Sequence, residues 1–193
     1  MSGTAGSPFA HQLPWKGRLM VDQRAVPSDI ADFDLTICGI DELHHHSTAP
    51  ITHVLSILDP EAPVPQAFEG YAALRQHWVL RFHDVSAPIG DARVPEQADV
   101  EQVLAFAAEL QVGAPNAHLL VHCHAGVSRS TAAAAILLAQ RNPGKEAEAF
   151  QYVARIRPGA WPNRRMVEIA DRLMHCDGRL IEGLRAMPRV GAP

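Results

Sequence analysis

The segment HCHAGVSRS, residues 122–130, places one thiol and one fixed cation close together in the chain. Cys123 becomes a strong nucleophile once it is a thiolate. Arg129 follows after five intervening residues, and its guanidinium is a planar fork of donors that suits a phosphate group. The pair therefore predicts nucleophilic attack on a bound phosphoryl group.

Two apolar elements flank this segment and must position it. The short apolar run 119–121 predicts a strand buried on both faces, and the alanine- and leucine-rich run 131–140 predicts a buried central helix. A loop that leads from the end of a strand to the start of a helix is where open α/β sheets bind ligands. Unpaired N–H groups and the positive end of the helix dipole lie there. Gly126 would let the backbone curl so that several N–H groups point inward.

The residues of the segment 122–130 predict different roles. Ser130 could donate a hydrogen bond to the thiolate when the cysteine must leave, and His122 could orient the loop from behind. Substrate contacts are expected from His124, Ala125, Gly126, Val127, Ser128 and Arg129.

This pattern, His122-Cys123-x-Ala125-Gly126-x-Ser128-Arg129-Ser130, resembles the His-Cys-x5-Arg-Ser/Thr signature of protein tyrosine phosphatases, most closely in its dual-specificity and small bacterial form. The resemblance implies that Cys123 forms a phosphocysteine intermediate. It implies that Arg129 and the loop amides hold the phosphoryl oxygens, and that Ser130 assists breakdown of the intermediate. It implies no metal and no cofactor.

The resemblance also implies a general acid, an aspartate on a separate loop upstream of the cysteine. Asp84 directly follows the strand expected over 78–82, and it is the favoured candidate for that reason. Asp91 lies nearer to Cys123 in sequence but deeper in a loop, and it stays the alternative.

A third match to the family is the segment RPGAWPN, residues 157–163, which resembles an Arg-Pro…Pro-Asn turn that lies close to the signature loop. Asn163 could orient the hydrolytic water. It could equally cap the helix that follows, a purely structural role.

The rest of the chain predicts an α/β domain. Four apolar runs have the length of strands, at 35–40, 52–58, 78–82 and 118–123. Helical spacing of apolar residues occurs at 100–108, 149–156 and 166–174. Because long connections rather than two-residue hairpins join the strands, we expect a three-layer fold. Its central sheet should have four or five mostly parallel strands, with helices on both faces.

The domain boundaries follow from composition. Residues 1–30 are rich in Gly, Ser, Pro and Ala and show no period, so we expect a flexible or loosely docked segment. The phosphatase-like domain is expected over 31–178. Residues 179–193 are expected to form a C-terminal arm.

Composition also limits partners and location. The net charge of −4 argues against a nucleic-acid binder driven by bulk positive charge. No apolar run is long enough to span a membrane, and the N-terminus lacks the apolar core of a secretory signal. Three irregularly spaced cysteines predict reduced thiols and a cytoplasmic protein. A regulatory disulfide between Cys123 and Cys38 or Cys176 stays open.

The sequence therefore predicts a metal-independent protein tyrosine or dual-specificity phosphatase, acting on a phosphorylated protein or a small phosphomonoester. A phosphoinositide phosphatase is the nearest alternative, although relatives that act on lipids often carry lysines in the loop and HAGVS has none. A phospho-binding module without turnover is another. An arsenate reductase is disfavoured because such enzymes usually carry the loop near the N-terminus.

Two further charged groups carry open interpretations. The histidines 44–46 follow one another directly, so on a helix they point in different directions and predict a short polar helix rather than a metal site. Four arginines flank the turn 157–163 and could form a basic rim for phosphorylated substrates or a solvated helix face. They are Arg155, Arg157, Arg164 and Arg165.

Overall fold

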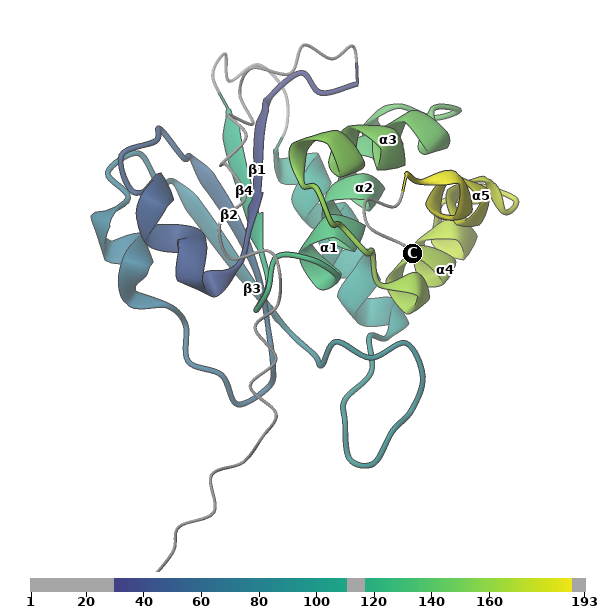
Figure 1. The fold of residues 1–193 in the computed structure, drawn as a ribbon, viewed down its shortest axis with the longest axis horizontal. Coiled ribbons are helices and arrows are strands. Elements are labelled where there is room, and N and C mark those ends of the chain that lie inside the picture. Colours follow the sequence, from purple (N-terminus) through teal and green to yellow (C-terminus); the bar gives the residue numbers. More distant parts are fainter. Residues whose placement is uncertain (1–29, 111–116, 189–193) are drawn as a thin grey trace, which may run out of the picture.

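The structure, a computed structural model, describes residues 30–110 and 117–188 (Figure 1). A sheet of four parallel strands forms its centre, in the order β1-β4-β2-β3. The strands are β1 (Asp34–Cys38), β2 (His53–Leu58), β3 (Gln76–Arg81) and β4 (His118–His122). In the register of the sheet, Cys38 and Ser56 both lie beside His122, so the carboxyl ends of these strands meet at one edge.

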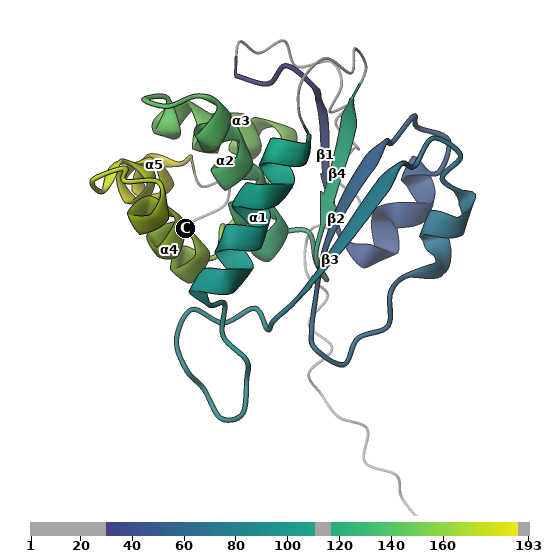
Figure 2. The same cartoon turned by 180° about the vertical axis from the view of Figure 1, so that it is seen from behind.

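Helices cover both faces of this sheet. The α-helices pack on one face, as Figures 1 and 2 show from opposite sides. They are α1 (Gln97–Glu109), α2 (Arg129–Arg141), α3 (Glu146–Ile156), α4 (Arg164–Leu173) and α5 (Arg179–Ala186). Two 3₁₀ helices, η2 (Ile40–His46) and η3 (Gln66–Gly70), lie on the other face. The expected three-layer α/β fold with a parallel sheet is confirmed.

The apolar core is divided by the sheet. The larger cluster fills the space between the sheet and the α-helices, and it includes Leu119 and Val121 of β4. The smaller cluster lies under η2 and η3 and includes Leu120 from the same strand. Because side chains alternate along a strand, β4 is buried on both faces, as its continuous apolar run predicted.

Helix α2 occupies the centre of the helical layer. Every one of its residues from Arg129 to 139 is buried, and it contacts α1, α3, α4 and the sheet. The run of alanines at 132–135 lets the neighbouring helices approach closely. The start of α2 is therefore held on several sides, and that start adjoins Cys123.

The C-terminal boundary differs from the expectation. Residues 179–186 form α5, which packs on α3 and α4, and Leu180 and Met187 are buried in the main core. A Cβ on Gly183 would lie 2.8 Å from the ring of Phe150, so the glycine allows this close approach. Residues 179–187 thus belong to the packed domain rather than to a separate arm. Apart from Ile30, which is buried, the expected N-terminal segment lies outside the described residues.

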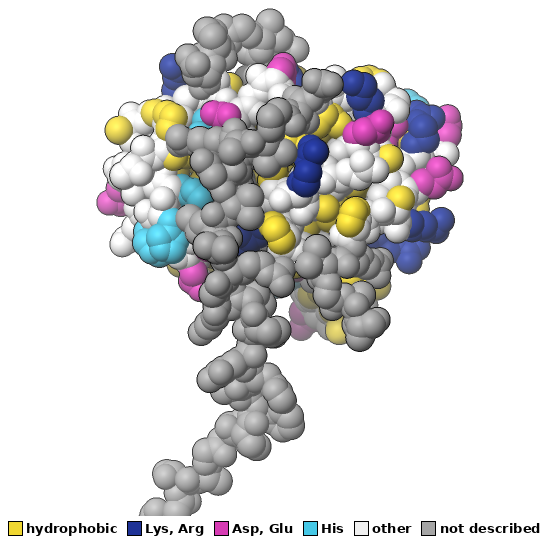
Figure 3. Space-filling view, turned by 45° about the horizontal axis from the view of Figure 1, so that its top comes forward, with side chains coloured by type: hydrophobic (Ala, Val, Ile, Leu, Met, Phe, Trp, Pro, Cys, Tyr) yellow, Lys and Arg dark blue, Asp and Glu magenta, His cyan; other side chains and the backbone are white. Residues whose placement is uncertain are grey.

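Charged side chains of both signs share the surface, and the histidine run lies in a short helix. On the face seen in Figure 3, the side chains of Lys or Arg and of Asp or Glu are interspersed over the helical side rather than sorted by sign. Residues 44–46 end the short helix η2, where His44 and His45 are exposed. Among the described residues, no group of three or more His, Cys, Asp or Glu side chains could hold a metal ion. Nor does the described part of the chain contain a helix long and apolar enough to cross a membrane.

Candidate active site

The predicted nucleophile lies at the carboxyl end of β4. Cys123 is 1% exposed, and its Sγ lies 3.3 Å from the Oγ of Ser130 in the first turn of α2. Residues 123–128, called here the cysteine loop, connect β4 directly to α2. The structure therefore places the thiol and the serine hydroxyl together, at the start of a helix, as the sequence predicted.

The carbonyls of residues 124–126 accept hydrogen bonds from groups that lie outside the cysteine loop. The carbonyl of His124 accepts a hydrogen bond from the amide of Ile40, at 3.0 Å. The carbonyls of Ala125 and Gly126 both accept from the guanidinium of Arg157, at 3.1 and 2.9 Å. This part of the loop is thus held by the start of η2, just after β1, and by the residue that follows α3.

The turn 157–163 holds the next two carbonyls. The amide of Trp161 donates to the carbonyl of Val127 at 2.8 Å, and the amide of Asn163 donates to the carbonyl of Ser128 at 3.2 Å. The turn therefore lies against the cysteine loop, as the match to the family's Arg-Pro…Pro-Asn turn implied.

These outward bonds fix the direction of the loop amides. In a trans peptide unit the N–H points opposite to the C=O of the preceding residue. With the carbonyls of 124–128 bound on the outside, the N–H groups of 125–129 are directed toward the inside. Within the described part of the chain, those N–H groups donate to no protein acceptor. Together with the positive end of α2, they form a site suited to an anion.

Gly126 makes this curl possible. Its φ of +69° lies in the left-handed region. A Cβ at this position would lie 2.4 Å from the carbonyl carbon of Cys38 and 2.5 Å from the amide nitrogen of Gly39. Any side chain would collide with the backbone at the end of β1, so glycine is required here. The prediction that Gly126 lets the loop curl is confirmed.

Arg129 is buried with one edge of its guanidinium already bound. Its Nη1 donates to Asp59 Oδ1 and to the carbonyl of Phe82, both at 2.6 Å. Its Nε is buried and has no partner among the described residues. A buried N–H without a partner costs free energy. A phosphate oxygen would satisfy this group, while Asp59 would keep the guanidinium in place.

Asp59 was missed in the sequence. It directly follows β2, just as the segment carrying Asp84 follows β3, and both strands end at the same edge of the sheet. That position is the signal that would have revealed it.

The structure brings Asp84, and not Asp91, to the cysteine loop. Oδ1 of Asp84 accepts hydrogen bonds from Ser128 Oγ at 2.6 Å and from Asn163 Nδ2 at 2.9 Å. Asp91 lies exposed in the loop that leads to α1. Asn163 also accepts from the amide of Met166 through Oδ1, at 3.2 Å, so it caps α4 as the structural alternative predicted.

The loop that carries Asp84 is closed at its base. The amide of His83 donates to the carbonyl of Arg93 at 2.8 Å, and the amide of Arg93 donates back to His83 Nδ1 at 3.0 Å. Arg93 also pairs with the buried Asp99 of α1, and Arg165 donates to the carbonyl of Pro95 at 2.6 Å. This loop, residues 82–96 and called here the aspartate loop, is therefore fastened to both α1 and α4.

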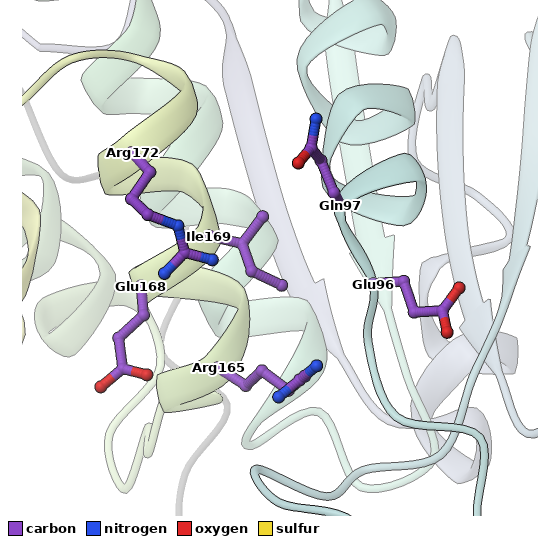
Figure 4. Close-up of a pocket in the computed structure, with 6 residues that line it drawn as sticks. All are labelled: Glu96, Gln97, Arg165, Glu168, Ile169 and Arg172. Carbon is purple, nitrogen blue, oxygen red and sulfur yellow. The ribbon is translucent and has the colours of Figure 1, made fainter.

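A pocket of about 300 Å³ lies beside this loop, between the start of α1 and α4 (Figure 4). Its lining residues are Glu96, Gln97, Arg165, Glu168, Ile169 and Arg172. Apart from Arg165, one of the four arginines of the possible basic rim, none of them is a predicted site residue, and their positive and negative charges balance. The pocket is therefore a separate feature from the cysteine loop.

His122 supports the cysteine loop from behind, as predicted. Its Nδ1 lies 3.4 Å from the carbonyl of Cys123, and its Nε2 lies 2.6 Å from Ser56 Oγ. Ser56 in turn lies 2.7 Å from His77 Nε2. Burial, with smaller contributions from the nearby His77 and Arg129 charges, lowers the pKa of His122 to about 4. The imidazole is therefore neutral at physiological pH.

This shift predicts a loss of stability in mild acid. As pH falls below about 6.5, the unfolded chain protonates His122 first, so folding loses up to about 3 kcal/mol by the folded pKa near 4. Urea unfolding at about pH 7.5 and about pH 4.5 measures the loss in the free energy of unfolding. His122→Asn should remove most of the contribution that His122 makes to this loss. His45→Asn is the control, because His45 is an exposed histidine of η2. An unchanged pH dependence in His122→Asn would contradict the assignment.

The three thiols are all free, and each is buried. Cys38 belongs to the smaller core cluster and Cys123 to the larger one, on opposite faces of the sheet. Burial raises the pKa of both Cys38 and Cys176. These thiols therefore resemble structural cysteines rather than reactive partners of Cys123.

The four arginines near the turn do not act together. Arg157 binds the cysteine loop and Arg165 binds the aspartate loop. Arg155 lies over the ring of Tyr152, and Arg164 pairs with Glu168 on α4. Of the four, only Arg155 and Arg164 lie as the residues of a solvated helix face would lie.

The sequence matches no protein-family model and no curated protein. Solved structures do match. Human DUSP28 is 22% identical, with a TM-score of 0.54, over 74% of this chain and 92% of that one. Human tyrosine phosphatase-like serine/threonine/tyrosine-interacting protein is 22% identical, with a TM-score of 0.57, over 77% and 95%. Cydia pomonella PTP-2 phosphatase is 23% identical, with a TM-score of 0.56, over 74% and 86%. The chain therefore has the fold of the cysteine-based protein tyrosine phosphatases, the dual-specificity phosphatases included.

Proposed function

We propose that this protein is a metal-independent phosphomonoester hydrolase of the protein tyrosine or dual-specificity class, acting through a phosphocysteine on Cys123. One observation carries the proposal. Among the described residues, the amides of 125–129 have no protein acceptor and the buried Nε of Arg129 has no partner, so a phosphoryl group bound at the cysteine loop would supply acceptors for both. Backbone and guanidinium donors at the start of a helix suit an oxyanion with several exposed oxygens.

The first step forms the S–P bond and breaks the P–O bond of the ester. The Cys123 thiolate attacks phosphorus, while protonated Asp84 gives its proton to the leaving oxygen. Ser128 and Asn163, which hold the Asp84 carboxyl at the loop, would keep it within reach of that oxygen. Arg129 and the loop amides stabilise the equatorial phosphoryl oxygens as charge develops.

The second step releases phosphate. Asp84, now a carboxylate, takes a proton from a water molecule that attacks phosphorus, and the S–P bond breaks. Ser130, 3.3 Å from the sulfur, donates a hydrogen bond to the departing thiolate. Every proton and electron pair is then accounted for without a metal ion.

The names of the structural neighbours support the phosphatase class, and one of them points to an alternative. DUSP28 and PTP-2 are structural neighbours of this chain. A third neighbour is named as a phosphatase-like interacting protein, and its name points to a phospho-binding module. A phospho-binding module would need the anion site but no acid and no nucleophile. This chain has Cys123, Ser130 and a docked Asp84, so we favour turnover over binding alone. The absence of lysine from HAGVS favours proteins over phosphoinositides as substrates.

The test is hydrolysis of p-nitrophenyl phosphate in EDTA, followed by a panel of substrates. We expect turnover without metal, inhibition by orthovanadate, and faster hydrolysis of phosphotyrosine peptides than of inositol phosphates. Binding of a phosphopeptide without turnover would favour the binding module. Faster hydrolysis of inositol phosphates would favour the phosphoinositide alternative.

A further inference from the structure

One arginine outside the cysteine loop binds two successive carbonyls of that loop. Arg157, the residue that follows α3, donates from Nε to Gly126 at 2.9 Å and from Nη2 to Ala125 at 3.1 Å. Its Nη1 donates to Glu42 Oε1 at 2.9 Å. The side chain of Arg157 is 17% exposed. A single planar group thus bridges the loop and a carboxylate.

Glu42 fastens this arginine to the end of β1. It lies in the first turn of η2, and its Oε2 accepts from the amide of Gly39 at 2.6 Å. Burial acts to raise the pKa of Glu42, but hydrogen bonds from Arg157 and Gly39 outweigh it and hold that pKa below its usual value. The carboxylate is therefore charged at neutral pH and faces a fixed cation.

The end of β1 makes a second contact with the same stretch of the loop. The backbone of Gly126 packs directly on Cys38 and Gly39, where no Cβ would fit. The loop is therefore held both by the end of β1 and by the guanidinium of Arg157. Neither contact involves the anion-facing side of the loop.

We propose that Arg157 and Glu42 form a clamp that positions the cysteine loop for phosphate, so that Arg157 is a positioning residue of the hydrolysis proposed above. The clamp fixes two peptide units, and the N–H groups of those units belong to Gly126 and Val127. Without the guanidinium, two carbonyls lose their donor next to a glycine that rotates freely. The amides then no longer converge before the phosphate arrives, and preorganisation is lost.

The experiment compares Arg157→Met, Arg157→Lys and Glu42→Gln with the control Arg141→Met. Arg141 makes a similar two-point contact with a carboxylate, Asp32, but at the far end of α2. Four measurements are made on each protein. They are kcat and KM for p-nitrophenyl phosphate, the inhibition constant of orthovanadate, the rate of Cys123 alkylation by iodoacetate at one fixed pH, and the thermal midpoint.

Arg157→Met is expected to lower kcat/KM about 10²-fold, the effect of losing preorganised donors. It should weaken orthovanadate inhibition and slow the alkylation of Cys123 by iodoacetate, because the misdirected amides no longer bind the anion or the anionic reagent beside the thiol. Arg157→Lys should recover only part of each effect, since one ammonium cannot bridge two carbonyls and a carboxylate. Arg141→Met should leave all three site measurements unchanged even where it lowers the thermal midpoint.

Two results would overturn the clamp. One is an Arg157→Met protein whose alkylation rate and orthovanadate inhibition equal those of the wild type. If that variant does not fold, an unchanged Glu42→Gln protein is equally decisive. A wild type that binds orthovanadate in an Arg157-dependent way but hydrolyses no ester would overturn the proposed hydrolase and support the clamp.

Discussion

Replacing Cys123 by serine is expected to lower kcat for p-nitrophenyl phosphate by at least about 10⁴-fold. Serine fills nearly the same space in this buried position, so the fold and the anion site should survive. The hydroxyl does not ionise at neutral pH, and among the described residues the side chain at 123 contacts the hydroxyl of Ser130, which is not a base. Only the nucleophile is therefore lost.

Binding and trapping separate this effect from a loss of structure. Titration calorimetry with tungstate should show that Cys123→Ser still binds an oxyanion. Acid-quenched wild-type enzyme should carry the added mass of one phosphoryl group on the peptide that contains Cys123, and the variant should not. Cys176→Ser, at another buried thiol away from the loop, is the matched control and should keep full activity. Substantial turnover in Cys123→Ser would rule out the phosphocysteine.

The cysteine loop could be predicted because its determinants are local. A thiol, a glycine and an arginine stand within nine residues, between a strand and a helix whose apolar patterns are unambiguous. Gly126 then curls as predicted, and Ser130 meets the sulfur within one helical turn. Local sequence determines such contacts because few backbone conformations can join the two elements.

The supporting residues come from distant parts of the chain and could not be predicted in the same way. Asp59 follows β2, Glu42 follows β1 and Arg157 follows α3. Asp59 reaches Arg129, and Glu42 reaches Arg157, because the strands are ordered β1-β4-β2-β3. No local pattern encodes that order. The sequence placed Arg157 at the start of a turn near the cysteine loop and in a basic rim or a solvated helix face, but a sequence does not show which carbonyls an arginine will meet.

The C-terminal arm was misjudged for a related physical reason. Residues 179–187 form one short helical segment between Gly178 and Pro188, and Gly183 within it lowers its intrinsic tendency to form a helix. Their packing depends on a partner surface that α3 and α4 provide. In contrast, the long apolar runs of β4 and α2 must be buried in any compact fold, so their positions were predictable.

The assignment of the general acid leads to the second large expected effect. Asp84→Asn should lower kcat for a phosphotyrosine peptide by about 10²–10⁴-fold, because asparagine accepts the same hydrogen bonds but has no proton to transfer. Asparagine can still accept from Ser128 and Asn163, so the aspartate loop should stay docked. Asp91→Asn, exposed in the same loop, is the matched control and should change kcat less than about twofold.

The choice of substrate sharpens this comparison. The phenolate of tyrosine leaves poorly without a proton, whereas p-nitrophenolate leaves readily, so the Asp84→Asn defect should be larger on the peptide. The variant should also lose the limb of the kcat profile that reports a protonated acid. If Asp91→Asn shows the larger defect instead, the aspartate loop must rearrange when substrate binds, and the hydrogen bonds of Asp84 would then serve only to hold the free loop closed.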